Sequence, residues 1–154
     1  KIVLSRANVP TGRSLGFFPG SIKDKLAPWL APMTNVLKQG LGSGRYDYME
    51  SKQEIEVQPI ETIRGRSFEH SLVLVDEAQN LTPKQMKTLI TRAGQGTKIV
   101  CIGNIGQIDS PYLSETTSGL TYVVDRFKHW ANGAHITLQQ GERSRLSLFA
   151  SESL

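Results

Sequence analysis

Two short runs of uninterrupted apolar residues constrain the fold more than any other feature of the sequence. LVLV at 72–75 and IVCI at 99–102 are rich in β-branched side chains. A strand with one solvated face alternates apolar and polar residues, whereas a strand buried on both faces does not. Strands buried on both faces are typical of parallel sheets that helices cover on both sides. The two runs therefore predict an α/β fold.

Five segments have the composition of strands, and helical patterns separate them. This alternation predicts a three-layer α/β sandwich with a mainly parallel sheet and right-handed crossovers. The chain of 154 residues is long enough for a single domain over 1–154, and its hydrophobic fraction of 38% is ordinary for one. The predicted strands are 1–5, 54–60, 71–77, 97–104 and 134–138.

Two segments carry clear helix signals. Segment 82–94 has Thr82 as N-cap, Pro83 at the first helical position and a glycine as its stop. Segment 118–130 repeats this pattern with Ser118 as the cap. Apolar residues recur at helical spacing in both segments, so we expect each helix to cover the sheet with one face.

The region between the first two predicted strands is expected to be less regular. Segment 21–40 has a helical apolar stripe, but Pro28 and Pro32 interrupt it. We therefore expect a short helix and a second one beginning near Pro28. Segment 41–53 is polar and rich in glycine, which predicts a flexible loop or a surface hairpin.

Charge and cysteine content narrow the classes of partner and compartment. A net charge of +4 and a pI near 9.3 favour anionic partners such as nucleic acid or nucleotide. The single Cys101 excludes an intrachain disulfide and suits a cytoplasmic protein, with the thiol as a small buried hydrophobe. No apolar run approaches the roughly 18 residues of a membrane span, so no membrane association is expected.

Two adjacent carboxylates, Asp76 and Glu77, come directly after the LVLV run. Like charges side by side repel unless a cation neutralises them. An Asp at this point can hold Mg²⁺, often through water, and a neighbouring Glu can orient or deprotonate an attacking water. The other interpretation is that the pair simply begins the loop before a helix.

Amide and guanidinium groups follow two other predicted strands. Gly103 lets the chain turn off its strand, and Asn104 and Gln107 place amides near the same sheet edge, where a Gln can hold a water in line with a γ-phosphate. Arg143 and Arg145 follow the last strand, and an Arg suits a transferring phosphoryl group. Taken singly, these segments also fit an ordinary Gly-Asn turn and solvated arginines.

An acid pair, an amide and an arginine in this order predict nucleotide hydrolysis, but one part is absent from the sequence. No GxxxxGK[ST] segment, the cradle that grips nucleotide phosphates, occurs in it. Lys1 opens directly on an apolar strand, so we expect the cradle to lie upstream and the fold to be incomplete at its N-terminus.

Basic side chains cluster in loops that are predicted to leave strand ends, with Phe17, Phe18 and Phe68 nearby. Basic grooves with interleaved aromatic residues bind single-stranded nucleic acid without base specificity. Burial of the two adjacent phenylalanines in a packed GFFPG turn, and salt-bridged arginines, are the alternatives. The predicted nucleic-acid contacts are Arg6, Arg13, Arg64 and Arg66.

Three stretches resemble the ATPase domain of the PhoH family across nearly the whole chain. They are KIVLSRANVPTGRSLGFFPGSIKDKLAPWLAPM, ETIRGRSFEHSLVLVDEAQNLTPKQMKTLITRAGQGTKIVCIGNIGQID, and TSGLTYVVDRFKHW with the later GERSRL. GNIGQID, SGLTYVVDRF and GERSRL are similar to the subgroup in which this domain follows a PIN ribonuclease domain. The resemblance implies a P-loop NTPase fold of the RecA-like type with ATP and Mg²⁺ as cofactors.

PhoH domains in turn resemble the first motor domain of superfamily 1 helicases, which implies a role for each motif. VDEAQN matches the Walker B motif, so Asp76 would bind Mg²⁺ and Glu77 would be the catalytic base. GNIGQ places Gln107 at the γ-phosphate, with Gly103 and Asn104 beside the nucleotide, although many relatives have Asp at the Asn position. LQQGERS resembles the motif whose arginine reaches the γ-phosphate, here Arg143.

The leading hypothesis is an ATPase domain that couples hydrolysis to binding or unwinding of RNA. Because the sequence lacks the phosphate cradle, we expect the 154 residues to be inactive on their own. A homo-oligomeric ring and a PIN domain in the same parent chain are further expectations from the resemblance. Two alternatives stay open. One is a non-catalytic nucleic-acid-binding or assembly module, and the other is an unrelated α/β enzyme that uses the two carboxylates as acid and base.

Overall fold

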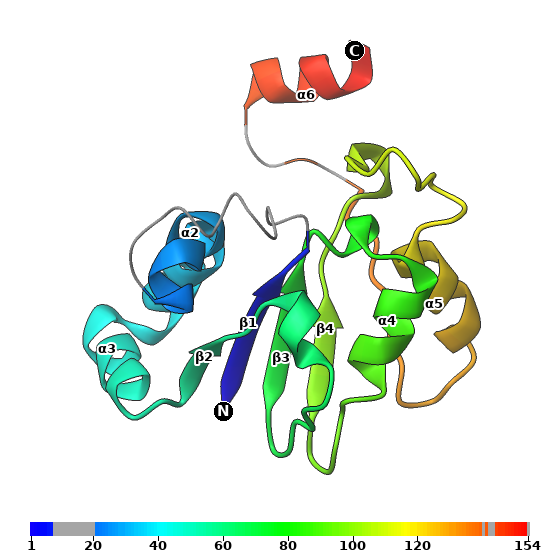
Figure 1. The fold of residues 1–154 in the computed structure, drawn as a ribbon. Coiled ribbons are helices and arrows are strands. Elements are labelled where there is room, and N and C mark those ends of the chain that lie inside the picture. The colour runs from blue at the N-terminus through cyan, green and yellow to red at the C-terminus, as the bar shows by residue number, and fades with distance from the viewer. Residues whose placement is uncertain (8–20, 140, 142–143, 154) are drawn as a thin grey trace. The chain divides into compact units, whose positions relative to one another are not determined.

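The computed structural model describes residues 1–7, 21–139, 141 and 144–153. Its centre is a sheet of four strands in the order β2-β1-β3-β4, and all three pairings are parallel (Figure 1). The predicted parallel sheet is therefore confirmed. The strands are β1 (Ile2–Arg6), β2 (Ile55–Val57), β3 (Leu72–Asp76) and β4 (Lys98–Cys101).

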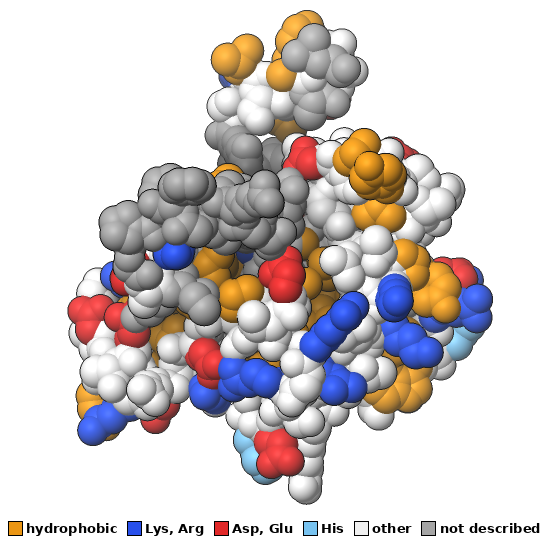
Figure 2. Space-filling model, in the orientation of Figure 1, with side chains coloured by type: hydrophobic (Ala, Val, Ile, Leu, Met, Phe, Trp, Pro, Cys, Tyr) orange, Lys and Arg blue, Asp and Glu red, His pale blue; other side chains and the backbone are white. Residues whose placement is uncertain are grey.

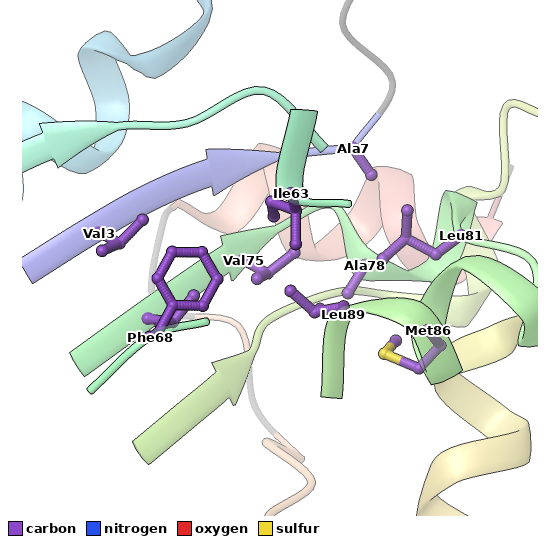
Figure 3. Packing of buried hydrophobic residues seen from close by; sticks show 10 residues of the cluster. Val3, Ala7, Ile63, Phe68, Val75, Ala78, Leu81, Met86 and Leu89 are labelled. Carbon is purple, nitrogen blue, oxygen red and sulfur yellow. The ribbon is translucent and has the colours of Figure 1, made fainter. Parts of the chain in front are cut away.

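Both faces of the sheet are covered, which gives the predicted three layers. Successive residues of a strand point to opposite faces, so Val3 and Leu4 enter different cores. The first core packs the sheet against α4 (Pro83–Ile90), and Figure 3 shows its side chains converging there. The second core packs it against α2 (Ile22–Leu41). The first contains Val3, Ala7, Ile63, Phe68, Val73, Val75, Ala78, Leu81, Met86 and Leu89, and the second Leu4, Leu26, Leu30, Tyr46 and Ile55.

The two clearest helix predictions are confirmed with shorter bounds. In α4, Thr82 accepts a hydrogen bond from the backbone N–H of Gln85, whose side chain in turn accepts from the Thr82 N–H, which forms a complete capping box. Helix α5 (Gly119–Phe127) begins after Ser118, whose hydroxyl accepts from the Leu120 N–H at 3.2 Å. Both caps satisfy N–H groups that the first helical turn leaves free.

The predicted break near Pro28 is wrong, because α2 is one helix of 20 residues with both prolines inside it. A capping box between Ser21 and Asp24 begins it. Pro28 and Pro32 are four residues apart and both exposed. The carbonyls that lose their intrahelical partner can then be solvated, and Leu26 and Leu30 hold the opposite face in the core.

The predicted flexible loop or hairpin over 41–53 is also wrong. Residues Ser43–Ser51 form the helix α3, separated from α2 by Gly42 with φ +80°. The segment has little helical amphipathicity, but Tyr46 is 3% exposed and packs into the second core. One buried aromatic side chain supplies the tertiary packing that outweighs the weak local helix preference.

One predicted strand is shorter than expected, and another is wrong. Only Ile55–Val57 of segment 54–60 pairs with β1, since Pro59 has no N–H for the ladder and precedes the short 3₁₀ helix η1 (Ile60–Ile63). Segment 134–138 is not a strand, and its Ile136 and Leu138 are more than 80% exposed. A strand needs a partner for its backbone groups, and composition alone does not supply one.

Contacts divide the chain into two compact units, Lys1–Val123 and Val124–Leu154. The first holds the sheet and both cores. The second contains an edge-to-face pair of Phe127 and Trp130, with ring centroids 5.5 Å apart, and the helix α6 (Arg145–Ser153). In the described part of the chain, no helix combines the length and apolar character needed to cross a bilayer.

Cys101 lies at the end of β4 and packs against the first core, as predicted. Its sulfur lies 3.8 Å from the Met86 sulfur. Burial raises the pKa of the Cys101 thiol to about 11, so the thiol stays protonated and unreactive near neutral pH.

Candidate active site at the carboxyl edge of the sheet

All four strands are parallel, so their carboxyl ends meet at one edge of the sheet, where ligands of such folds bind. The register pairs Arg6 of β1 directly with Asp76 of β3. The backbone continues this alignment, because the Ala7 N–H donates to the Asp76 carbonyl at 2.9 Å. The predicted Walker B acids therefore lie beside the end of β1.

The guanidinium of Arg6 lies on the acid pair. One of its nitrogens donates to Asp76 Oδ2 at 3.0 Å and to the Trp29 carbonyl of α2 at 3.1 Å. The other nitrogen donates to Glu77 Oε1 at 3.1 Å. These side chains are only 20–30% exposed, so the charges interact more strongly here than on an open surface. The cation that the acid pair requires is supplied, in this structure, by Arg6.

Glu77 turns the chain off β3 with an unusual backbone conformation. Its φ of +54° and ψ of +33° lie in the left-handed region, which residues other than Gly, Asn and Asp seldom occupy. The following Ala78 N–H donates to the Ile102 carbonyl at 2.9 Å, which fixes the turn against the end of β4. Such conformations cost of order 1–3 kcal/mol and persist where the surroundings determine them, often at functional sites.

Gln79 connects the acid pair to the segment after β4, a role that the sequence pattern did not predict. Its side chain is fully buried. Its amide nitrogen donates to Glu77 Oε2 at 2.6 Å and to the Gln107 carbonyl at 2.9 Å, and its amide oxygen accepts from the Asn104 N–H at 3.2 Å. No local sequence pattern signals this role, because the burial of the amide and the partners that it requires are set by the fold.

A glycine is needed at position 103 because the Gln79 side chain lies directly against its backbone. A Cβ on it would lie 2.5 Å from the amide oxygen of Gln79, so a larger residue would displace that side chain. Asn104 caps the short 3₁₀ helix η3 (Ile105–Gln107), and its Oδ1 accepts from the Gly106 N–H at 3.0 Å. Gly103 and Asn104 thus both lie at the edge of the sheet, and it is their backbones that approach the Gln79 side chain. The side chain of Gln107 is exposed.

The predicted nucleic-acid residues have different surroundings. Arg66 donates to Glu56 and Gln58 and lies over the Phe68 ring, whereas Arg64 is exposed and lines a pocket of about 240 Å³ with Gln85 and Thr88. The Arg66 hydrogen bond, together with Lys1, holds the pKa of Glu56 below its usual range despite partial burial. The predictions for Arg13 and Arg143 lie outside the described residues.

The edge fits a hydrated Mg²⁺. Such ions are usually held by one or two carboxylates together with waters and substrate phosphates, so two adjacent acids are a sufficient protein donor set. The described residues contain no group of three or more metal-ligating side chains, which excludes a dense cage of the zinc type there. The Arg6 guanidinium already forms ion pairs with Asp76 and Glu77, so the position stabilises a cation.

Comparison with known proteins identifies the family of the chain. A family model described as PhoH-like protein matches residues 1–151. The chain is 40% identical to Protein PhoH2 of Bacillus subtilis (strain 168) over its whole length, which spans 36% of that protein. It is 38% identical to a PhoH-like protein of the same organism over 97% of the chain and 46% of that protein.

A third relative, Protein PhoH of Escherichia coli (strain K12), is 36% identical over 83% of the chain and 36% of its own length. The chain thus spans less than half the length of these relatives. PhoH-like proteins are predicted P-loop ATPases, and the parallel α/β sheet is consistent with that class. On its sequence and its fold, the chain belongs to the PhoH-like family.

Proposed function

We propose that the chain is the nucleotide-hydrolysing domain of a PhoH-like protein and that it couples Mg-ATP hydrolysis to binding or unwinding of RNA. The observation that carries this proposal is the connected edge of the sheet. Asp76 and Glu77 lie together there, and the buried Gln79 amide ties Glu77 to the segment of Asn104 and Gln107. A site that holds an acid and an amide segment in fixed relation suits hydrolysis of a phosphoanhydride.

Each residue has a distinct role in this proposal. Asp76 holds the metal, in part through water, and a bound Mg²⁺ supplies charge neutralisation on the phosphates. Glu77 orients the attacking water and accepts its proton. Gln107 senses the γ-phosphate, and its exposed side chain on η3 is available for that contact. Arg143, which stabilises the developing charge, is assigned from the family resemblance.

The sequence contains no GxxxxGK[ST] segment, the cradle that grips nucleotide phosphates. We therefore expect the 154 residues alone to hydrolyse ATP poorly. A PIN ribonuclease domain in the same protein and assembly into a ring stay predictions from the resemblance. Light scattering of the full-length protein, with and without ATP, tests the ring.

One face of the first unit supports the proposal that the protein binds RNA. Arg64 is exposed beside its pocket, and it forms none of the ion pairs found among the described residues. Lys84 and Lys87 are exposed on the neighbouring α4, and Figure 2 shows Lys and Arg side chains over the face that α4 and η1 cover. Exposed cations on one face suit a phosphate backbone, although Glu61 lines the same pocket as Arg64.

The test of hydrolysis is ATP turnover by the full-length protein with and without single-stranded RNA. We expect Glu77→Gln to lower turnover about 100-fold or more while ATP binding is kept, because the amide cannot accept the proton. Unchanged turnover would remove Glu77 from the reaction. An RNA-independent rate in the wild type would leave an ATPase but refute the coupling.

The test of the RNA face compares Arg64→Ala with Arg45→Ala, which removes an exposed charge on α3. We expect only Arg64→Ala to weaken RNA binding, by about tenfold, and to reduce the slope of log K against log salt by roughly one. Equal effects of the two substitutions would show that net charge, and not this face, determines binding.

One observation favours the alternative of a non-catalytic module. Arg6 occupies the acid pair, so a positive side chain stands where the nucleotide's metal would bind. A protein that had lost turnover could keep such a pair permanently closed. Absence of any ATP hydrolysis in the full-length protein, together with normal RNA binding, would support that alternative.

A further inference from the structure

Arg6 is held at the acid pair by three separate elements. It extends from the end of β1, donates to Asp76 at the end of β3 and to Glu77 in the following turn, and also donates to the Trp29 carbonyl in α2. Its position opposite Asp76 in the sheet register makes the contact a cross-strand pair and not a chance meeting of surface chains. The geometry therefore belongs to the fold.

A guanidinium and a divalent cation cannot both use these oxygens freely. Arg6 donates to Asp76 Oδ2 and Glu77 Oε1, and Gln79 already donates to Glu77 Oε2. Arg6, Asp76 and Glu77 together carry a formal charge of about −1, whereas Asp76 and Glu77 without Arg6 carry about −2. A metal approaching the closed pair meets a fixed positive charge and carboxylates that already have hydrogen-bond partners.

Release of Arg6 need not leave its charge unsatisfied. The Trp29 carbonyl, 3.1 Å from one guanidinium nitrogen, is an acceptor that does not belong to the acid pair. The arginine can therefore keep one contact on α2 while the carboxylates become available. The structure shows the pair closed on Arg6, and the Trp29 contact would let the arginine stay bound to α2 if the pair opened.

We propose that Arg6 is a latch on the acid pair: it holds Asp76 and Glu77 in place without metal and must leave them before a divalent cation binds. The proposal rests on the proposed function insofar as it takes Asp76 as the metal ligand. It gives Arg6 a positioning role within the nucleotide site in place of the nucleic-acid contact predicted from the sequence. The latch makes metal binding compete with an internal ion pair.

The experiment is a titration of the full-length protein with Mn²⁺, followed by the electron paramagnetic resonance signal of the free ion. We expect Arg6→Gln to bind Mn²⁺ at least about tenfold more tightly than the wild type, because the competing charge is gone. Arg6→Lys, which keeps the charge but cannot bridge two carboxylates, should show a smaller increase of about threefold. Arg45→Gln removes the same charge from α3 and should leave the affinity unchanged.

Thermal unfolding supplies a second readout. In EDTA, Arg6→Gln should unfold at a lower temperature than the wild type, since the two acids then repel each other, and saturating Mn²⁺ should raise its midpoint more than it raises that of the wild type. Equal or weaker Mn²⁺ affinity in Arg6→Gln would overturn the latch. If that variant does not fold, Arg6→Lys decides, and unchanged affinity in it overturns the latch.

The substitution Asp76→Asn separates this outcome from failure of the proposed function. Loss of Mn²⁺ binding in Asp76→Asn, combined with no effect of Arg6→Gln, would refute the latch and keep the metal site. Equal Mn²⁺ binding by the wild type and Asp76→Asn would refute the metal site, and the latch with it.

Discussion

Replacing Gln79 by leucine removes the group that joins the two halves of the proposed site. Leucine has a similar size and suits the buried position, so the main change is the loss of hydrogen bonds and not of volume. Three contacts disappear, at 2.6 Å to Glu77, 2.9 Å to the Gln107 carbonyl and 3.2 Å from the Asn104 N–H. Glu77 then keeps Arg6 as its remaining hydrogen-bond donor among the described residues.

The stability cost follows from these contacts. A neutral hydrogen bond contributes about 1 kcal/mol net and one to a charged group about 1.5–3 kcal/mol, so the three together contribute roughly 3–5 kcal/mol. Glu77, Asn104 and Gln107 are partly or fully exposed, and water can replace part of this loss. We therefore expect the free energy of unfolding to fall by about 2–4 kcal/mol, measured by urea denaturation.

A matched control separates misplacement of Glu77 from general destabilisation. Gln58 is 8% exposed, and its side chain is hydrogen-bonded to Thr62 and Arg66 and not to Glu77 or the Gln107 segment. Gln79→Leu should lower kcat of the full-length protein about tenfold or more at a temperature where it is folded, because Glu77 loses its fixed orientation. Gln58→Leu should lower stability and leave kcat intact. If Gln79→Leu stays within about 0.5 kcal/mol of the wild type with normal kcat, the connecting role is refuted.

Three further substitutions test close approach and charge. Gly119→Ala should lower the free energy of unfolding by about 2–3 kcal/mol in urea, since its Cβ would lie 2.6–2.8 Å from the backbone of Leu81 and Thr82, which cannot move aside, and a normal value would contradict this packing. Gly103→Ala should cost a similar amount, because its Cβ would lie 2.5 Å from the amide oxygen of the buried, hydrogen-bonded Gln79 side chain and 3.0 Å from the Gln79 backbone nitrogen. The lowered pKa of Glu56 adds stability above its ordinary value of 4.5 that is lost as the pH falls towards the folded-state value. Glu56→Gln should thus lower the melting temperature at pH 7, and this difference from the wild type should shrink in acid; a difference that does not change with pH would refute the linkage.

The parts of the fold that the sequence predicted are those set by local pattern. Continuous apolar runs identified β3 and β4, because only strands covered on both faces need them. Thr82 and Pro83 identified the beginning of α4, because capping depends on a few neighbouring residues. The failures at α2 and α3 have the opposite cause. There, contacts of Leu30 and Tyr46 with the second core outweigh proline and glycine signals that are correct only for an isolated chain.

In the candidate site, too, local features could be predicted from the sequence and long-range contacts could not. The acid pair could be predicted because a carboxylate following a buried strand is a local feature, and parallel topology brings all such ends to one edge. The nucleic-acid contact predicted for Arg6 stays a prediction. Its ion pair with Asp76 was not predicted, because that partner is 70 residues away and only the β1–β3 register places the two together. Gln79 could not be assigned, because its role depends on atoms of Asn104 and Gln107 that come from a different strand end. The residues proposed to carry the chemistry are thus visible in the sequence, whereas those that connect them are determined by strand order. In this chain Arg6 and Gln79 donate to the two oxygens of Glu77, and in the proposed mechanism they therefore determine when that carboxylate is free to act.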